Sequence, residues 1–102
     1  MSVRWTRTAQ IKNNHVIEAI AWSKEISGWC EKKHKITVDT WIDTVGAHNT
    51  IRWTVDYADI ASFDKVTTAV MMDAEYWSFV QKATKAELFI DGVGHDTLSK
   101  KM

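Results

Sequence analysis

The sequence predicts a single α+β domain in which the elements follow the order strand, helix, strand, strand, helix, strand. The chain has 102 residues, the size of one domain, and 45% of them are apolar, which is enough to build a core. Stretches with apolar side chains at every second position alternate with stretches of helical spacing. Because there is no proline and there are only four glycines, nothing marks a linker, and residues 1–102 are expected to form one domain.

The first half of the chain predicts a strand, a helix and a hairpin. Residues 3–12 alternate between apolar and polar side chains, with Arg7 as an exception on the apolar side. Asn14 is a favourable N-cap, and apolar residues at helical spacing follow it as far as position 33. Residues 36–43 and 50–57 alternate again around a turn, so these two strands are expected to pair as an antiparallel hairpin.

The second half predicts a broken helix and a last strand. Helical spacing begins at residues 59–62, with Ser62 as the expected N-cap. Asp73 is a second candidate cap, so a break in the helix is expected just before it. Residues 88–90 are apolar and predict a last short strand, whereas residues 95–102 are polar and either add a short strand or fray.

This order of elements is that of a ferredoxin-like fold, with a four-stranded antiparallel sheet and the helices on one face. One face of the predicted sheet is apolar and should bury against the helices. The other face carries charged and aromatic side chains, and four of them form the candidate ligand-binding set: Asp39, Trp41, Arg52 and Asp56. In a monomer they would only form a wet surface, whereas between two facing sheets they would line a cavity, with pairs such as Asp39 and Arg52.

Composition argues against several classes of function. The formal net charge is +0, and no basic face is evident, so we expect no nucleic-acid partner. No apolar run is long enough to span a bilayer, and the N-terminus lacks the apolar core of a signal peptide, so we expect no membrane partner and a cytoplasmic location. The single cysteine, Cys30, lies on the apolar stripe of the first helix and is expected to be a packed core residue.

The polar motifs point to no metal, cofactor or catalytic group. The four histidines are dispersed without ligand spacing, so we expect neither a metal site nor a cofactor. His95 and Asp96 form either an orienting pair for acid–base work or only a turn. The glycines at 92 and 94 lack the third glycine and the strand-to-helix context of a phosphate loop.

The tryptophans indicate an oligomer. Six of them are many for a chain of this length. Trp5 and Trp53 fit the core, but the remaining four cannot all be interior in so small a domain: Trp22, Trp29, Trp41 and Trp77. Large aromatic side chains left at a surface suggest an interface.

The C-terminal third resembles the end of many dimeric α+β barrel proteins. In that group a short helix containing an Asp-x-Glu-Tyr motif often leads into a last strand, and the matching segments here are Asp73-Ala74-Glu75-Tyr76-Trp77-Ser78-Phe79-Val80, Lys82-Ala83 and Leu88-Phe89-Ile90-Asp91-Gly92-Val93-Gly94-His95-Asp96. The group includes antibiotic-biosynthesis monooxygenase-like, stress-responsive barrel-like and NIPSNAP-like domains. The resemblance implies a homodimer whose two sheets face each other around a cavity.

The resemblance does not imply one reaction, because the superfamily includes cofactor-independent oxygenases, haem-degrading enzymes, isomerases and members with no known activity. No histidine lies in the second helix, where a haem-binding member would be expected to place its ligand. Our first hypothesis is therefore a homodimeric small-ligand-binding or structural domain without chemistry of its own. The alternative is a cofactor-independent monooxygenase or isomerase acting on an aromatic or polyketide-like molecule. RNA binding on the sheet face is a third, weaker interpretation, because the aromatic and basic strand motif is absent.

Overall fold

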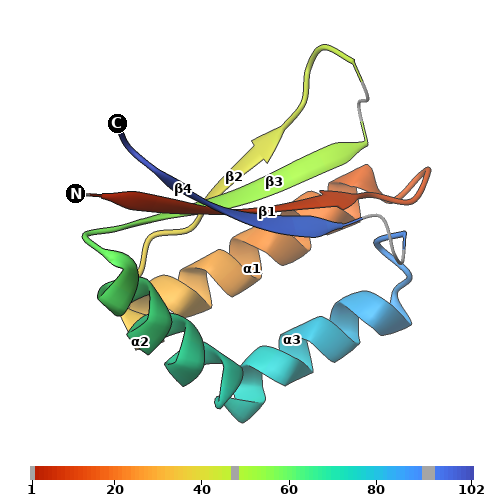
Figure 1. The fold of residues 1–102 in the computed structure, drawn as a ribbon. Coiled ribbons are helices and arrows are strands. Elements are labelled where there is room, and N and C mark those ends of the chain that lie inside the picture. Colours follow the sequence, from red (N-terminus) through yellow and green to blue (C-terminus); the bar gives the residue numbers. More distant parts are fainter. Residues whose placement is uncertain (1, 47–48, 91–93) are drawn as a thin grey trace.

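The computed structural model describes residues 2–46, 49–90 and 94–102, and it contains the predicted α+β architecture (Figure 1). The elements are β1 (Val3–Gln10), α1 (Val16–His34), β2 (Asp39–Ile42), β3 (Thr50–Tyr57), α2 (Ile60–Met71), α3 (Ala74–Lys85) and β4 (His95–Lys100). The second helical region is divided into α2 and α3 near Met72, as the second cap predicted.

The four strands form one antiparallel sheet in the order β2-β3-β1-β4. All three helices lie on the same side of this sheet, as Figure 1 shows, which gives the molecule two layers. We call the side that carries the helices the helix face and the other side the open face. No helix in the described ranges is long and apolar enough to cross a membrane.

The core lies between the helix face and the helices α1 and α2. Alternate residues of β1 and β3 point into it, because successive strand side chains point to opposite faces. Trp53 is buried, and its indole Nε1 donates to the Ser23 hydroxyl at 2.9 Å. That hydroxyl donates to the carbonyl of Ala19 at 2.8 Å, so both buried polar groups are satisfied. The rings of Trp22 and Phe89 meet Trp53 edge to face and complete the cluster.

Two predicted helix caps were wrong, and one is confirmed. Asn14 lies before the cap position with φ 69°, a left-handed conformation that asparagine tolerates, and α1 starts from His15 without a side-chain cap. The cap of α2 is Asp59, whose carboxylate accepts from the Ser62 amide at 2.7 Å, so Ser62 is the capped residue. Asp73 caps α3 as predicted, by accepting from the amide of Glu75.

Polar contacts tie the start of α3 to the end of α1. The Asp73 carboxylate accepts from His34 Nε2 at 3.0 Å and pairs with Lys33 at 2.9 Å. Lys33 also contacts Glu75, which in turn accepts from Trp29 Nε1 at 3.2 Å. The Lys33 ammonium is the main cause of the lowered pKa of Asp73. The same carboxylate therefore caps one helix and anchors it to another.

The last strand of the sheet lies in the C-terminal tail, where a short strand was one of the two expected alternatives, and not at residues 88–90. Residues 88–90 add only an isolated bridge, between Phe89 and Ile11, and the fourth strand of the sheet is β4. All six residues of β4 are exposed, because it is an edge strand beyond the cover of the helices. Its polar sequence therefore carries no apolar alternation. The second strand is also shorter than expected, since Lys35 ends α1 with φ 58° and pairing starts only at Asp39.

Candidate open-face site

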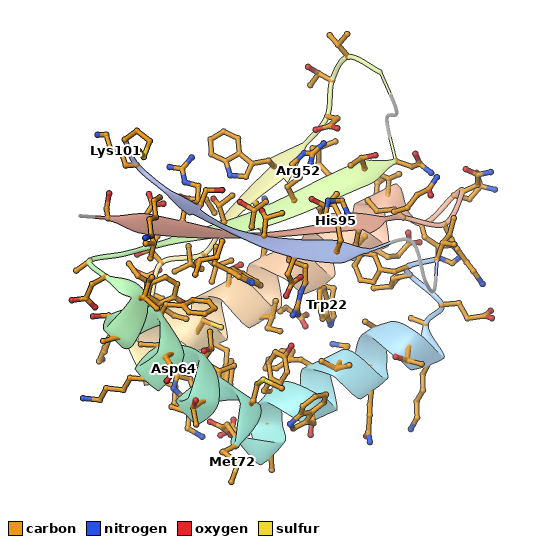
Figure 2. The ribbon with its side chains drawn as sticks, in the orientation of Figure 1. Trp22, Arg52, Asp64, Met72, His95 and Lys101 are labelled. Carbon is orange, nitrogen blue, oxygen red and sulfur yellow. The ribbon has the colours of Figure 1, made fainter. Side chains whose placement is uncertain are left out.

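The open face brings together the four residues that the sequence predicted as a ligand-binding set. The pairing register places Arg52, Thr54 and Asp56 of β3 on one side of the sheet together with Asp39 and Trp41 of β2. From β1, Arg4, Thr6 and Thr8 join this face, because they stand opposite these β3 residues. Figure 2 shows Arg52 on the side away from the helices, whereas Trp22 lies on the helix side.

Arg52 is paired with a carboxylate, but not with the predicted one. Its Nε and Nη2 donate to the two carboxylate oxygens of Asp43 at 3.3 and 3.1 Å, and its Nη1 donates to the Thr8 hydroxyl at 3.1 Å. Asp39 stands opposite Thr54 instead. The expected pair of Asp39 and Arg52 was therefore wrong, since Asp43 lies on the turn side of Trp41 and occupies the guanidinium.

Asp56 is paired across the sheet with Arg4. The Arg4 Nε and Nη2 donate to the two oxygens of Asp56 at 2.7 and 3.0 Å. These hydrogen bonds hold the pKa of Asp56 below its ordinary value and raise the pKa of Arg4. Both side chains are more than half exposed, so the pair contributes little to stability while the face is in water.

Trp41 is the large aromatic residue of the open face. The residue is 53% exposed, yet its Nε1 donates to the Thr54 hydroxyl at 2.9 Å. Thr54 is itself buried although it points away from the helices. The hydrogen bond fixes the indole beside β3 and leaves much of its surface open to solvent.

A hollow of about 560 Å³ lies beside Trp41. It is lined by Arg4, Thr6, Trp41, Ile42, Asp43, Thr44, Val45, Arg52 and Thr54. Of the predicted set, Trp41 and Arg52 line this open-face hollow, whereas Asp39 and Asp56 lie outside its lining. Residues 43–46, which follow β2, extend away from the helices (Figure 1) and contribute Val45, which is almost fully exposed, to the lining. The volume lies within the roughly 300–1,000 Å³ typical of small-molecule sites.

A second hollow, of about 360 Å³, lies at the start of β4. His95 and Asp96 both line it, but neighbouring strand residues point to opposite faces, so they do not form an orienting pair. Asp96 accepts from Arg7 Nε and Nη2 at 2.8 and 2.9 Å and from Trp5 Nε1 at 3.3 Å. Arg7 also donates to the Tyr76 hydroxyl at 3.2 Å. Arg7, the exception in the alternation of the first strand, thus links β1 to both β4 and α3.

Cys30 is a buried residue of α1. Burial raises the pKa of the Cys30 thiol to about 11, so the thiol is protonated at neutral pH, in agreement with a packed core residue. Across the described ranges, no three histidine, cysteine or acidic side chains are grouped as a metal site requires. His48 and the glycine at 92 lie outside the described residues.

Comparison with known proteins identifies the fold. No family model matches the chain, and no curated protein is similar in sequence. A NIPSNAP-like domain protein from Burkholderia xenovorans superposes with a TM-score of 0.81 at 12% identity, over 99% of this chain and 85% of the other. A NIPSNAP family protein of unknown function from Agrobacterium tumefaciens gives 0.77 at 18% identity, over 98% and 87% of the two chains.

A conserved protein from Methanosarcina mazei gives a TM-score of 0.73 at 12% identity, over 100% of this chain and 94% of the other. At such low identities these similarities establish a shared fold. The ferredoxin-like α+β fold inferred from the sequence, and its likeness to NIPSNAP-like domains, are therefore confirmed at the level of the fold.

Proposed function

We propose that the chain works as a homodimer in which the open faces of two copies meet and enclose a small-ligand-binding cavity. The observation that carries this proposal is the contrast between the two sides of the sheet. In the described residues all three helices cover one side, and the other side keeps a half-exposed Trp41 beside a hollow. A second copy placed over this side would enclose the hollow.

The side chains of the open face suit a protein interface. Tryptophan and arginine are enriched at the centres of interfaces, and Trp41, Arg4 and Arg52 all border the hollow. Both arginines are already paired with carboxylates of their own chain. Burying them under a second copy would therefore leave no uncompensated charge, which is the costly case in an interface.

The resemblance to dimeric α+β barrels supports the same arrangement. Ligand binding is the favoured role, and a purely structural dimer is the simpler form of the same proposal. The alternative of a cofactor-independent monooxygenase or isomerase gains no support from the Agrobacterium tumefaciens neighbour, whose function is unknown. A cytoplasmic location remains part of the proposal, supported by the buried thiol of Cys30, which suits a reducing compartment.

Light scattering across a dilution series tests the proposal. The unaltered chain is expected to show the mass of two copies, and Trp41→Ala is expected to shift the equilibrium toward one copy, because truncation of a central tryptophan typically weakens an interface at least tenfold. Trp77→Ala is the matched control, since Trp77 is exposed to a similar degree but belongs to α3 on the helix side.

Two outcomes would contradict the proposal. One is the mass of a single copy at every concentration of the unaltered chain. The other is a dimer that persists in Trp41→Ala but dissociates in Trp77→Ala, because this would place the interface on the helix side.

A further inference from the structure

The two arginines that line the open-face hollow each form an ion pair with a carboxylate of the same chain. Asp43 forms a bidentate pair with Arg52, in which both carboxylate oxygens accept from the guanidinium, and Asp56 pairs with Arg4 in the same way. Asp39 also lies on this face, but outside the lining, and its charge acts on Arg4. Each guanidinium that lines the hollow is therefore paired with a carboxylate, and among the described lining residues no charged side chain is left without an oppositely charged partner.

This balance disfavours charged ligands. An anion would have to displace Asp43 from Arg52, or else leave a surplus negative charge in the hollow. A cation would meet two guanidinium groups whose carboxylates are already engaged. Either mismatch is costly in a site shielded from water, because interactions between charges strengthen as the local dielectric constant falls. An uncharged molecule incurs neither cost.

Trp41 gives the hollow a preference for flat ligands. Its Nε1 donates to the Thr54 hydroxyl, and this hydrogen bond holds the indole in one orientation with much of the residue exposed. Planar rings stack on such surfaces in offset or edge-to-face arrangements. Hydroxyl groups of Thr6 and Thr54 border the same space and can exchange hydrogen bonds with uncharged polar atoms.

We propose that the open-face hollow binds an uncharged molecule with a flat ring system, stacked on Trp41, and that Asp43 excludes anions by occupying Arg52. This inference rests on the proposed function in one respect, because a second copy would close the hollow and strengthen the discrimination. Asp43 thus determines specificity through its ion pair with Arg52. The same pair also links the end of β2 to β3.

Three probes that share one ring system test the charge preference: 2-naphthol, 2-naphthoate and 2-naphthylmethylammonium. At neutral pH they are uncharged, negative and positive. Calorimetric titration of the full chain is expected to show 2-naphthol binding roughly tenfold or more tightly than either ion. Trp41→Ala should abolish this binding, and Trp77→Ala should leave it unchanged. Equal binding of either ion, no binding of 2-naphthol, or full binding by Trp41→Ala would overturn the inference.

Asp43→Asn separates a specificity role from a merely structural one. The substitution releases the Arg52 guanidinium, so the affinity for 2-naphthoate should rise roughly tenfold while that for 2-naphthol changes little. Asp39→Asn is the matched control, because it removes a carboxylate from β2, the strand that directly precedes Asp43, without opening the pair of Arg52 and Asp43. A gain of equal size in Asp39→Asn, or no gain in Asp43→Asn, would contradict the assignment.

Light scattering on the same samples keeps the two proposals apart. A single-copy chain that still prefers 2-naphthol rejects the dimer and retains the inference on the ligand. A dimer that binds none of the probes, or that prefers an ion, retains the assembly and rejects the inference.

Discussion

The two faces of the sheet are built from the same strands but by different means. On the helix face, apolar side chains pack around Trp53, whose one polar atom is satisfied by Ser23. On the open face, Trp41 likewise donates to a hydroxyl, that of Thr54, but it remains half exposed among paired charges. Two tryptophans on neighbouring strands thus make the same kind of hydrogen bond in opposite surroundings. Fold stability belongs to the helix face, and the recognition that we propose belongs to the open face.

The largest expected effect comes from removing the tryptophan of the helix face. Trp53→Ala should lower the free energy of unfolding by about 3–5 kcal/mol, because it leaves a cavity in the core and removes the partner of the Ser23 hydroxyl. Trp41→Ala should cost about 1 kcal/mol or less within one copy, since the residue is already half exposed.

Urea denaturation at several protein concentrations measures both variants, because it separates the stability of one copy from that of association. Similar losses of unfolding free energy in Trp53→Ala and Trp41→Ala would contradict the proposed difference between the two faces. So would a loss in Trp41→Ala that exceeds the loss in Trp53→Ala when both are referred to a single copy.

A smaller effect is expected at the charged contact that holds β4. The hydrogen bond from Arg7 is the main cause that keeps the pKa of Asp96 below its ordinary value of 3.8. This carboxylate therefore stabilises the fold fully above its unfolded pKa, near 4. The contribution is lost as the pH falls through the lower pKa of the folded state. Asp96→Asn should cost about 1 kcal/mol at neutral pH, a modest value because both side chains are partly exposed.

Urea denaturation at pH 7 and pH 3 checks this expectation. The unaltered chain should lose more stability between the two values than Asp96→Asn does. An identical loss in both proteins would show that the contact of Asp96 with Arg7 and Trp5 does not hold β4 to the sheet.

The smallest effect is expected on the open face. Asp56→Asn removes an ion pair of the same two-pronged geometry, but both partners are more than half exposed. Because such pairs contribute little in water, the free energy of unfolding of one copy should not change measurably. A loss as large as that of Asp96→Asn, measured in the same titration, would remove the distinction between the two faces.

The sequence predicted those parts of the fold in which one face is buried and the other is not. β1 and β3 were located by alternation, and Asp73 was identified as a cap, because each of these signals is local. For β4 the sequence left a short strand and a frayed end as alternatives, because this strand is exposed along its whole length and no burial imposes a pattern on it. The role of Arg7 was not predictable, since its partner Asp96 lies 89 positions away in the sequence.

The candidate site was predicted in composition but not in its pairing. Alternation placed Asp39, Trp41, Arg52 and Asp56 on one face, and the structure agrees. It could not choose the partner of Arg52, because Asp39 and Asp43 flank Trp41 symmetrically in the sequence and Trp41 stands opposite Arg52. Which of the two carboxylates pairs with Arg52 depends on the orientation of their side chains in the folded hairpin.

Spin labels placed on the two faces test the central claim most directly. Ser99→Cys labels the open face and Gln81→Cys labels α3, while the native Cys30 is protected by burial. Electron–electron double resonance should give a short distance between copies, below roughly 30 Å, for the label at 99, because facing sheets pack about 10 Å apart. The label at 81 should give a clearly longer distance. A shorter distance at 81, or no distance between copies at either site, would contradict the account.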